Sequence, residues 1–408
     1  MRWPSVKIDF IKAETRNALV GGPFGSDLST RHYVEEGVPV IRGTNLPDEQ
    51  AFKDDDFVFV SDEKADALIS NNAVPGDVIF TQRGTLGQVG LIPENSRFPR
   101  YVVSQSQMKL TVNPDKAEAR FVYYFFRRPN TVQTVKNRAI TSGVPHINLG
   151  ILREFEMPLP PLATQRSIVT TLSAYDDLME NNRRRMALLE EAARLLYREW
   201  FVRLRFLGHE HTRVTDGIPE GWELKTLGEI CTDLRETVSP DVLDPDTPYI
   251  GLEHIPRRSI SLTEWGTAET VTSTKLRYKT GDILFGKIRP YFHKVGLAFT
   301  DGVTSSDAIV IRPNTDDLRS LVLMVVSSDE FVAEASQTMR EGSKMPRADW
   351  KHMITYPVVL PPPGLLADFT ETVTAITDQL RNLCFQNQKL RAARDLLLPK
   401  LMSGEIEV

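Results

Sequence analysis

The feature that most constrains this 408-residue chain is a heptad pattern of apolar residues between Gln165 and Phe201. Apolar side chains recur there at alternating spacings of four and three, with one polar interruption at Asn182. A seam this narrow on so long a helix requires a second helix to cover it. The chain supplies one, because a seam of the same phase runs from Phe369 to Leu401, interrupted by Asn387 and Arg394. The pattern therefore predicts two long helices that pack on each other.

The polar interruptions indicate how the two helices are oriented. If opposite ends of the seams are set against each other, Asn182 lies opposite Asn387, and Arg394 lies opposite Tyr175 as a cation–π pair. Parallel helices would instead bury the Asn182 amide beside Leu383, and an unpaired buried amide costs ~1–3 kcal/mol. A matched asparagine pair also fixes coiled-coil register. The sequence thus predicts antiparallel helices with both asparagines in one layer; the alternative is that both lie near the surface where the helices splay.

The two halves of the chain repeat one pattern, which predicts two copies of one domain. Val74–Pro93 corresponds to Lys279–Ala298, and Val103–Asn113 corresponds to Val303–Asn314. Short runs of Val, Ile, Phe and Tyr between Gly, Pro, Asn and Asp are typical of a strand-rich α+β domain. We therefore expect two globular α+β domains in tandem repeat, separated by two long helices that form an antiparallel coiled coil. The expected segments are a first domain at 1–157, a central helical spacer at 158–207, a second domain at 208–360 and a C-terminal helical spacer at 361–408.

Composition limits the class of protein. Forty-nine Lys and Arg against 54 Asp and Glu give a formal charge of −5, which argues against a simple polybasic nucleic-acid binder but permits local basic patches. The sequence contains no apolar run long enough to span a bilayer and nothing that resembles a signal peptide. Its two cysteines, Cys231 and Cys384, fit a reducing compartment. We expect a cytoplasmic protein with no membrane attachment.

Catalytic and metal-binding signatures are missing from the sequence. Gly281–Ile288 matches a phosphate-binding loop up to its lysine, but Ile288 stands where a metal-binding Ser or Thr is needed. His209 and His211 lie in a polar linker with no further ligand nearby in the sequence, which is more typical of a solvated segment than of a metal site. We expect no catalytic residue, no metal and no cofactor in the chain itself.

Candidate binding residues lie in loops of the two halves. Arg, Lys, Gln and Thr are the side chains that read base edges and hold phosphates. A basic residue at the same place in both loops, Arg83 and Arg289, favours a binding role over an ordinary solvated turn, which is the alternative for each loop. The candidates for DNA contacts are Gln82, Arg83, Thr85, Gln105 and His146 in the first half, and Lys287, Arg289, Tyr291, His293, Lys294, Lys344 and Arg347 in the second.

Leucines also lie on the long helices away from the seams. These residues predict a second apolar surface that partner helices could cover, so the chain alone should be poorly behaved. They are Leu178, Leu188, Leu195 and Leu398.

Several short motifs occur in an order that resembles the DNA-specificity subunits of Type I restriction-modification systems. The resemblance covers essentially the whole chain and rests on the order of many weak motifs. The motifs are Gly22–Ser26 (GPFGS), Gly76–Phe80 (GDVIF) with its copy Gly281–Phe285 (GDILF), Ser142–Leu149 before Leu159–Gln165 (LPPLATQ), and Leu396–Ile406 (LLLPKLMSGEI). The sequence departs from the family at Pro361–Leu366 (PPPGLL), which lacks the usual Glu-Gln after the prolines.

The resemblance implies a function. Two target-recognition domains would read a bipartite, asymmetric site in double-stranded DNA, and two helical regions would act as a ruler and dock two modification subunits. Those partners would carry S-adenosylmethionine and methylate adenine, restriction subunits can join the complex, and the chain itself would be non-catalytic. Two other classes remain as alternatives, a fused DNA methyltransferase or nuclease and a scaffold that does not bind DNA.

Overall fold

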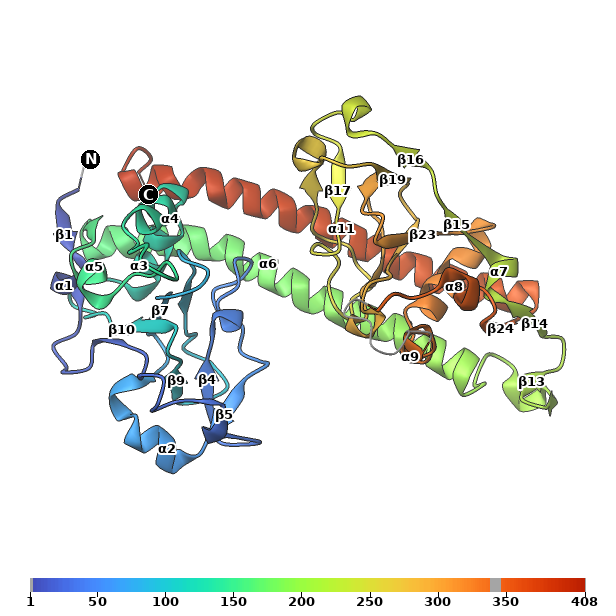
Figure 1. Cartoon of the computed structure of the whole chain (residues 1–408), viewed down its shortest axis with the longest axis horizontal. Helices are drawn as coiled ribbons and strands as arrows, with labels where there is room; N and C mark the ends of the chain where they lie inside the picture. The colour runs from blue at the N-terminus through green and yellow to red at the C-terminus, as the bar shows by residue number, and fades with distance from the viewer. Residues whose placement is uncertain (1–2, 338–345, 408) are drawn as a thin grey trace. The chain divides into compact units, whose positions relative to one another are not determined.

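The computed structural model describes residues 3–337 and 346–407 of the chain (Figure 1). These residues form two compact units. Unit 1 comprises residues 1–180 and 388–408, and unit 2 comprises residues 181–387. Two long helices, α6 (Leu162–Tyr197) and α11 (Pro363–Ser403), contribute residues to both units.

Unit 1 contains a four-stranded antiparallel sheet in the order β2-β10-β7-β8. Its central strands are short runs of buried residues, as their Val, Ile, Phe and Leu content predicts. Helices α3, α4 and α5 pack with this sheet around one hydrophobic core (Figure 1). The elements are β2 (Leu19–Gly21), β7 (Val78–Thr81), β8 (Val89–Leu91), β10 (Gln107–Leu110), α3 (Ala119–Arg127), α4 (Pro129–Asn137) and α5 (Leu149–Arg153).

The turn before β7 explains the GDVIF motif. Gly76 has a φ of 87°, a backbone conformation that favours glycine. The buried Asp77 carboxylate accepts hydrogen bonds from the Val74 backbone N–H at 3.0 Å and from the Thr111 hydroxyl at 2.5 Å. It also lies 3.4 Å from the buried Lys109 ammonium. A buried carboxylate needs such partners, so the motif locks the start of the strand.

A second sheet of unit 1 has five strands in the order β3-β5-β4-β9-β6. Strands β4 and β9 are parallel, with Val40 paired to Val102, whereas the other neighbours are antiparallel. A separate pair, β1 with β11, brings the start of the unit to the segment that leads into α6. The elements are β1 (Ser5–Lys7), α1 (Ile8–Ile11), β3 (Tyr33–Val34), β4 (Val38–Ile41), β5 (Val58–Val60), α2 (Asp62–Ala67), β6 (Asn72–Ala73), β9 (Tyr101–Val103) and β11 (Glu156–Pro158).

Unit 2 repeats the order of the four-stranded sheet and of four strands of the five-stranded sheet, whose fifth strand is added at the opposite edge. This repeat confirms the predicted tandem α+β domains. The four-stranded sheet of unit 2 has the order β15-β23-β20-β21, and its five-stranded sheet, β16-β19-β22-β17-β18, again contains one parallel pair, β17 with β22. Asp282 repeats the role of Asp77, because it accepts two hydrogen bonds of 2.6 Å from Arg312. The elements are β14 (Glu223–Thr226), α7 (Leu227–Ile230), β15 (Cys231–Leu234), β16 (Thr237–Val238), β17 (Pro248–Ile250), β18 (Gly266–Thr267), β19 (Lys275–Tyr278), β20 (Ile283–Gly286), β21 (Val295–Leu297), β22 (Gly302–Thr304), β23 (Ala308–Pro313), α8 (Arg319–Val326), α9 (Asp329–Gln337), α10 (Trp350–Met353) and β24 (Pro357–Leu360).

The two long helices are antiparallel in unit 2. The Asn182 side-chain amide donates to the Asn387 side-chain oxygen at 2.9 Å. Further along the pair, the Trp200 and Phe369 ring centroids lie 5.9 Å apart. Residue numbers rise along α6 while they fall along α11, so the predicted orientation and the predicted asparagine layer are both confirmed.

Within unit 1, two details of the helix pair differ from the sequence-based predictions. Arg394 does not pair with Tyr175, because its guanidinium donates to the Asp176 carboxylate at 2.6 Å. A carboxylate one position along the helix is a stronger partner for a buried guanidinium than an aromatic ring is. Leu398 is buried in the hydrophobic core rather than on a second apolar surface. By contrast, Leu178 is exposed as predicted.

The starts of the two helices are not equivalent. In unit 1 the buried Gln165 side chain donates to the Pro160 carbonyl at 2.8 Å and accepts from the Glu118 N–H at 2.9 Å. In unit 2 the corresponding residue is Leu366, which packs at the hydrophobic core. The departure from the family motif at Pro361–Leu366 therefore replaces the two side-chain hydrogen bonds of Gln165 with an apolar contact of Leu366.

Candidate nucleic-acid interface

Three segments of unit 1 meet at the end of β7. The Gln82 and Arg83 backbone N–H groups donate to the Ser106 carbonyl at 2.7 and 3.3 Å, and the Gln82 carbonyl accepts from Ile147 at 3.0 Å. Arg83 and His146 form an isolated antiparallel bridge. The backbone thus brings four predicted residues into one cluster, because Gln105 directly precedes Ser106.

Side chains of this cluster differ in exposure. Arg83, Thr85 and Gln105 are exposed, whereas Gln82 and His146 are half-buried. One ring nitrogen of His146, Nδ1, lies 3.1 Å from the Val144 carbonyl. The exposed members offer one guanidinium, one hydroxyl and one amide, which together can donate to and accept from base edges.

The GPFGS loop lies beside this cluster. A Cβ on Gly22 would lie 1.9 Å from the Ser104 carbonyl oxygen, so only glycine allows the two backbones to approach this closely. Farther along the loop, a Cβ on Gly25 would lie 3.5 Å from the Gln105 amide oxygen. The loop presents Phe24 with 82% of its surface exposed. Sequence reasoning used this motif only as a family signal and did not select Phe24 as a contact.

The corresponding loop of unit 2 closes in the same way. The Lys287 N–H donates to the Asp307 carbonyl at 3.0 Å, and the Lys287 carbonyl accepts from Ala348 at 2.8 Å. Ile288 forms an isolated bridge with Arg347. The exposed Arg347 guanidinium lies 3.3 Å from the Asp307 carboxylate. Lys344, also predicted here, lies outside the described residues.

The hydrogen-bond register corrects one prediction. Strand β7 pairs Phe80 with Met108 and β20 pairs Phe285 with Ile309. Counting from these pairs, Gln82 corresponds to Lys287 and Arg83 corresponds to Ile288.

Arg289 therefore corresponds to Gly84 rather than to Arg83. Both residues have a positive φ, 49° at Arg289 and 102° at Gly84. The two turns share a backbone shape, but they do not carry a basic residue at the same place.

His293 does not fit the prediction that it faces DNA. Only 7% of the residue is exposed, its Nε2 donates to the Ser327 carbonyl at 2.8 Å, and its Nδ1 lies 3.3 Å from the Asp329 carboxylate. Burial lowers the pKa of His293, although the contacts with Ser327 and Asp329 oppose this. The histidine holds the turn against the start of α9.

Lys294 is also held inside unit 2. Its ammonium donates to the Leu252 carbonyl, and burial, together with the nearby Arg257, lowers the pKa of this lysine. Tyr291 is 51% exposed, and its ring packs edge-to-face on Phe292 at 4.9 Å. Of the predicted residues of this turn, Lys287, Arg289 and Tyr291 therefore remain available to a ligand.

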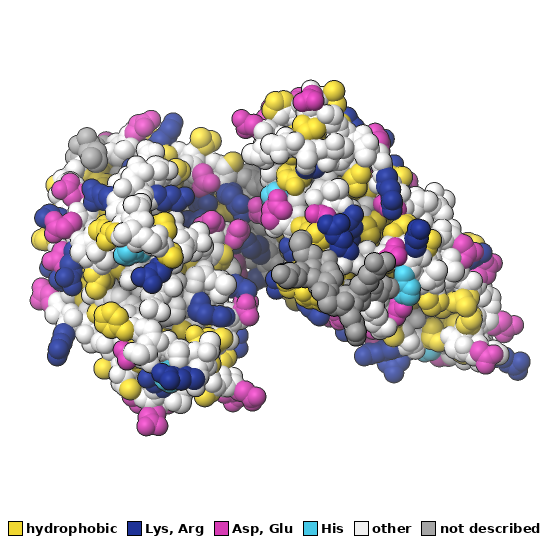
Figure 2. All heavy atoms as spheres, viewed as in Figure 1, with side chains coloured by type: hydrophobic (Ala, Val, Ile, Leu, Met, Phe, Trp, Pro, Cys, Tyr) yellow, Lys and Arg dark blue, Asp and Glu magenta, His cyan; other side chains and the backbone are white. Residues whose placement is uncertain are grey.

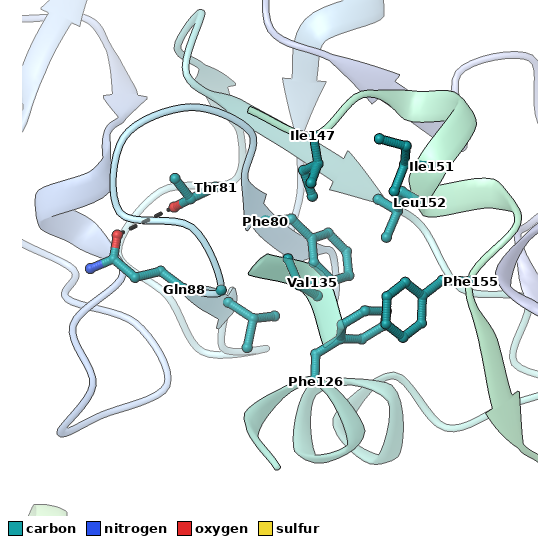
Figure 3. Close-up of a pocket in the computed structure, with 11 residues that line it drawn as sticks. Phe80, Thr81, Gln88, Phe126, Val135, Ile147, Ile151, Leu152 and Phe155 are labelled. Carbon is teal, nitrogen blue, oxygen red and sulfur yellow. Dashed lines mark hydrogen bonds between the residues drawn. The ribbon is translucent and has the colours of Figure 1, made fainter. Parts of the chain in front are cut away.

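A small cavity lies behind the loop of unit 1 (Figure 3). Phe80, Phe126 and Phe155 line it with other apolar side chains, and the Thr81 hydroxyl donates to the Gln88 side-chain oxygen at 3.3 Å beside it. Its volume is ≈ 10 Å³, about the space of one water molecule. The cavity is therefore a packing defect under the loop and not a ligand site.

The described residues hold neither a metal-binding cluster nor a membrane-spanning helix. Residues 3–337 and 346–407 contain no cluster of three or more His, Cys, Asp and Glu side chains placed to hold a metal ion. No helix within those ranges combines the length and the apolarity needed to cross a bilayer. Basic and acidic side chains are interspersed over the visible face of each unit (Figure 2).

Comparisons with known proteins agree with this architecture. The family model Methylase_S, described as the Type I restriction modification DNA specificity domain, matches residues 32–191. The Type I restriction enzyme MjaIX specificity subunit of Methanocaldococcus jannaschii is 22% identical over 346 residues, which cover 82% of this chain and 78% of the relative. The EcoDI specificity subunit of Escherichia coli is 23% identical over 285 residues, covering 63% of this chain and 62% of the relative.

A solved structure shares the fold. The crystal structure of the Type-I restriction-modification system S subunit from M. genitalium superimposes with a TM-score of 0.55 at 16% identity, covering 98% of this chain and 96% of that one. The domain model and the relatives come from the same family that the order of motifs along the sequence resembles. Over most of its length, this chain is therefore similar to the specificity subunits of Type I restriction-modification systems.

Proposed function

We propose that this chain is the non-catalytic, DNA-recognising subunit of a Type I restriction-modification complex and reads a bipartite, asymmetric site in double-stranded DNA. One observation carries the proposal. The same backbone arrangement closes both recognition loops, with Gln82 bonded to Ser106 in unit 1 and Lys287 bonded to Asp307 in unit 2. The side chains on those loops differ, and loops that vary on a common scaffold are the usual basis of changed specificity.

Each half of the site is read by one globular domain. Residues 1–157 and 208–360 act as the target-recognition domains, with helical spacers at 158–207 and 361–408. The exposed contacts we assign are Arg83, Thr85 and Gln105 in the first domain and Arg289, Tyr291 and Arg347 in the second, together with the half-buried Lys287. Gln82 and His146 are half-buried and shape the first loop.

Partners dock on the long helices. Leu188 and Leu195 in unit 2 are 72% and 47% exposed on α6, and Leu178 is exposed in unit 1. Exposed leucines along one helix suit the apolar face of a partner helix. We assign these surfaces to two modification subunits, which carry S-adenosylmethionine and methylate adenine in the cytoplasm, and restriction subunits join the same assembly.

A mobility-shift experiment with purified components tests the proposal. The full chain is mixed with its modification subunits and a duplex that contains the target, against an excess of random duplex. The assembled complex should select the target and methylate adenine when S-adenosylmethionine is added, whereas the chain alone should do neither. Methylation by the chain alone would favour the fused-enzyme alternative, and an assembled complex that does not prefer any duplex would refute DNA recognition.

A further inference from the structure

An arginine outside the predicted loops joins the candidate interface of unit 2. The Arg257 guanidinium carbon lies 4.1 Å from the centroid of the Phe292 ring, and that of Arg289 lies 5.8 Å from the same ring. Both arginines are exposed. Two guanidinium groups that lie against one aromatic ring form a compact donor group, because the ring face attracts each cation.

The backbone fixes this group on each side. The Arg289 N–H donates to the Pro346 carbonyl at 2.8 Å, and the Phe292 N–H donates to the Arg289 carbonyl at 2.8 Å. On the other side, the Arg258 N–H donates to the His293 carbonyl at 2.9 Å. The Arg258 side chain is in turn paired with Asp329 at 2.8 Å. The residue next to Arg257 is therefore tied to the same turn that carries Phe292.

The arginines of this group are not engaged by acidic side chains in ion pairs among residues 3–337 and 346–407. No ion pair is formed there by Arg257, Arg289 or Lys287, whereas the adjacent Arg258 and Arg347 pair with Asp329 and Asp307. Positive charge from Arg257 also helps to lower the pKa of Lys294, after burial, which is the larger cause. Several neighbouring cations without an ion pair are suited to bind hydrogen-bond acceptors of a ligand from outside the chain.

Unit 1 lacks this group. The parallel pairs Val40 with Val102 and Tyr249 with Val303 align the two five-stranded sheets. From that alignment, Asp48 stands at the position of Arg257. Because the charges at these corresponding positions are opposite, we expect Arg257 to have a role only in the half-site that unit 2 reads.

We propose that Arg257 is a specificity-determining residue, which donates two N–H groups to the O6 and N7 acceptors of a guanine in the half-site read by unit 2. Phe292 is the positioning residue, since its ring fixes the plane of the guanidinium. A planar fork held in one orientation suits the paired acceptors of a guanine edge, and arginine to guanine is the commonest specific base contact. This inference rests on the function proposed above.

The test uses the full chain assembled with its modification subunits. Competition binding is measured against a set of duplexes in which each base pair of the target is replaced in turn. Arg257→Ala should weaken binding to the target by roughly 10- to 100-fold and abolish discrimination at one G·C pair of one half-site. Arg257→Lys should also lose that discrimination, although it keeps the charge, and Phe292→Leu should lose part of it.

Arg277→Ala serves as the matched control. Arg277 is an exposed arginine of the same unit, 3.5 Å from Glu236, and its removal changes the net charge equally. Its discrimination profile should equal that of the wild type.

Two results would overturn the inference while leaving the proposed function intact. One is an unchanged profile for Arg257→Ala. The other is equal weakening on all duplexes with a smaller salt dependence, which indicates a phosphate contact. If the wild-type complex itself does not discriminate target from random DNA, the proposed function fails instead.

Discussion

Replacing Asp176 with Ala tests the polar contact that joins the long helices within unit 1. Arg394 is only 6% exposed, and its guanidinium donates to one Asp176 oxygen at 2.6 Å. The Tyr124 hydroxyl donates to the other Asp176 oxygen at 2.6 Å. The substitution therefore removes the acceptor from a buried cation and from a largely buried hydroxyl together.

The expected loss of unfolding free energy depends on which partners the charged Arg394 side chain keeps after Asp176 is replaced. Burial alone would lower the pKa of Arg394, but Asp176 and Asp395 raise it more strongly, so this side chain stays charged at every accessible pH. Removing one partner of a buried ion pair costs about 3–5 kcal/mol. The Asp176 side chain is 23% exposed, and Arg394 keeps Asp395 at 2.8 Å. We therefore expect a loss of about 2–3 kcal/mol in the unfolding free energy of unit 1.

Asp177→Ala is the control for this prediction. The adjacent carboxylate is 74% exposed and lies 4.0 Å from Arg120, so its loss should cost less than about 0.5 kcal/mol. The assay is urea unfolding of the full chain, followed by hydrogen exchange of segments 388–403 and 119–127. These segments belong to unit 1, so its unfolding is read separately. Equal effects of the two substitutions would refute the reasoning.

Four further predictions concern other parts of the chain. Gly364→Ala should raise stability by about 0.4–1 kcal/mol, because the residue lies in α11 with no heavy atom within 4 Å of an added Cβ; a lower melting temperature would contradict this. Burial lowers the pKa of His293 below its ordinary 6.5, so as pH falls the unfolded chain takes up this proton first. Unit 2 should therefore lose stability as pH drops below 6.5, and His293→Gln should flatten that decline in urea unfolding; an unaltered pH dependence would argue against it. Burial raises the pKa of Cys231 to about 12, so iodoacetamide at pH 8 should label this thiol slowly in the native chain and rapidly in urea. The chain without partners should bind target DNA weakly at physiological salt, and tight specific binding would show that partners are unnecessary.

The architecture could be predicted from the sequence because it depends on patterns that extend over many residues, such as the heptad seam. A heptad seam specifies which residues share a layer, and that was enough to place Asn182 against Asn387. The same seam does not specify which neighbour within a layer takes a charged group, so Arg394 was paired with Tyr175 instead of Asp176. Apolar packing along the seam decides which residues share a layer, whereas electrostatic attraction decides which neighbour a charged side chain in that layer contacts.

The candidate site was harder to predict because single residues in a turn do not reveal their direction. Arg289 and His293 both adopt the left-handed conformation around a short 3-10 turn, and this geometry buries His293 while Arg289 stays exposed. The sequence pattern of charged residues between aromatic ones does not show that His293 points inward while Arg289 points outward. Arg257 was missed because its loop comes close to Phe292 only in the folded unit. The one signal in the sequence was the charge reversal against Asp48.

The central claim, that each unit reads its own half of the target, is tested most directly by mapping methylated adenines across a genome. The wild-type chain, an Arg83→Ala chain and an Arg289→Ala chain are each expressed with the modification subunits in cells that lack other adenine methylation. The wild type should give one two-part motif separated by unspecified bases. Arg83→Ala should relax only one part and Arg289→Ala only the other. A continuous motif, or two variants that alter the same part, would contradict the account.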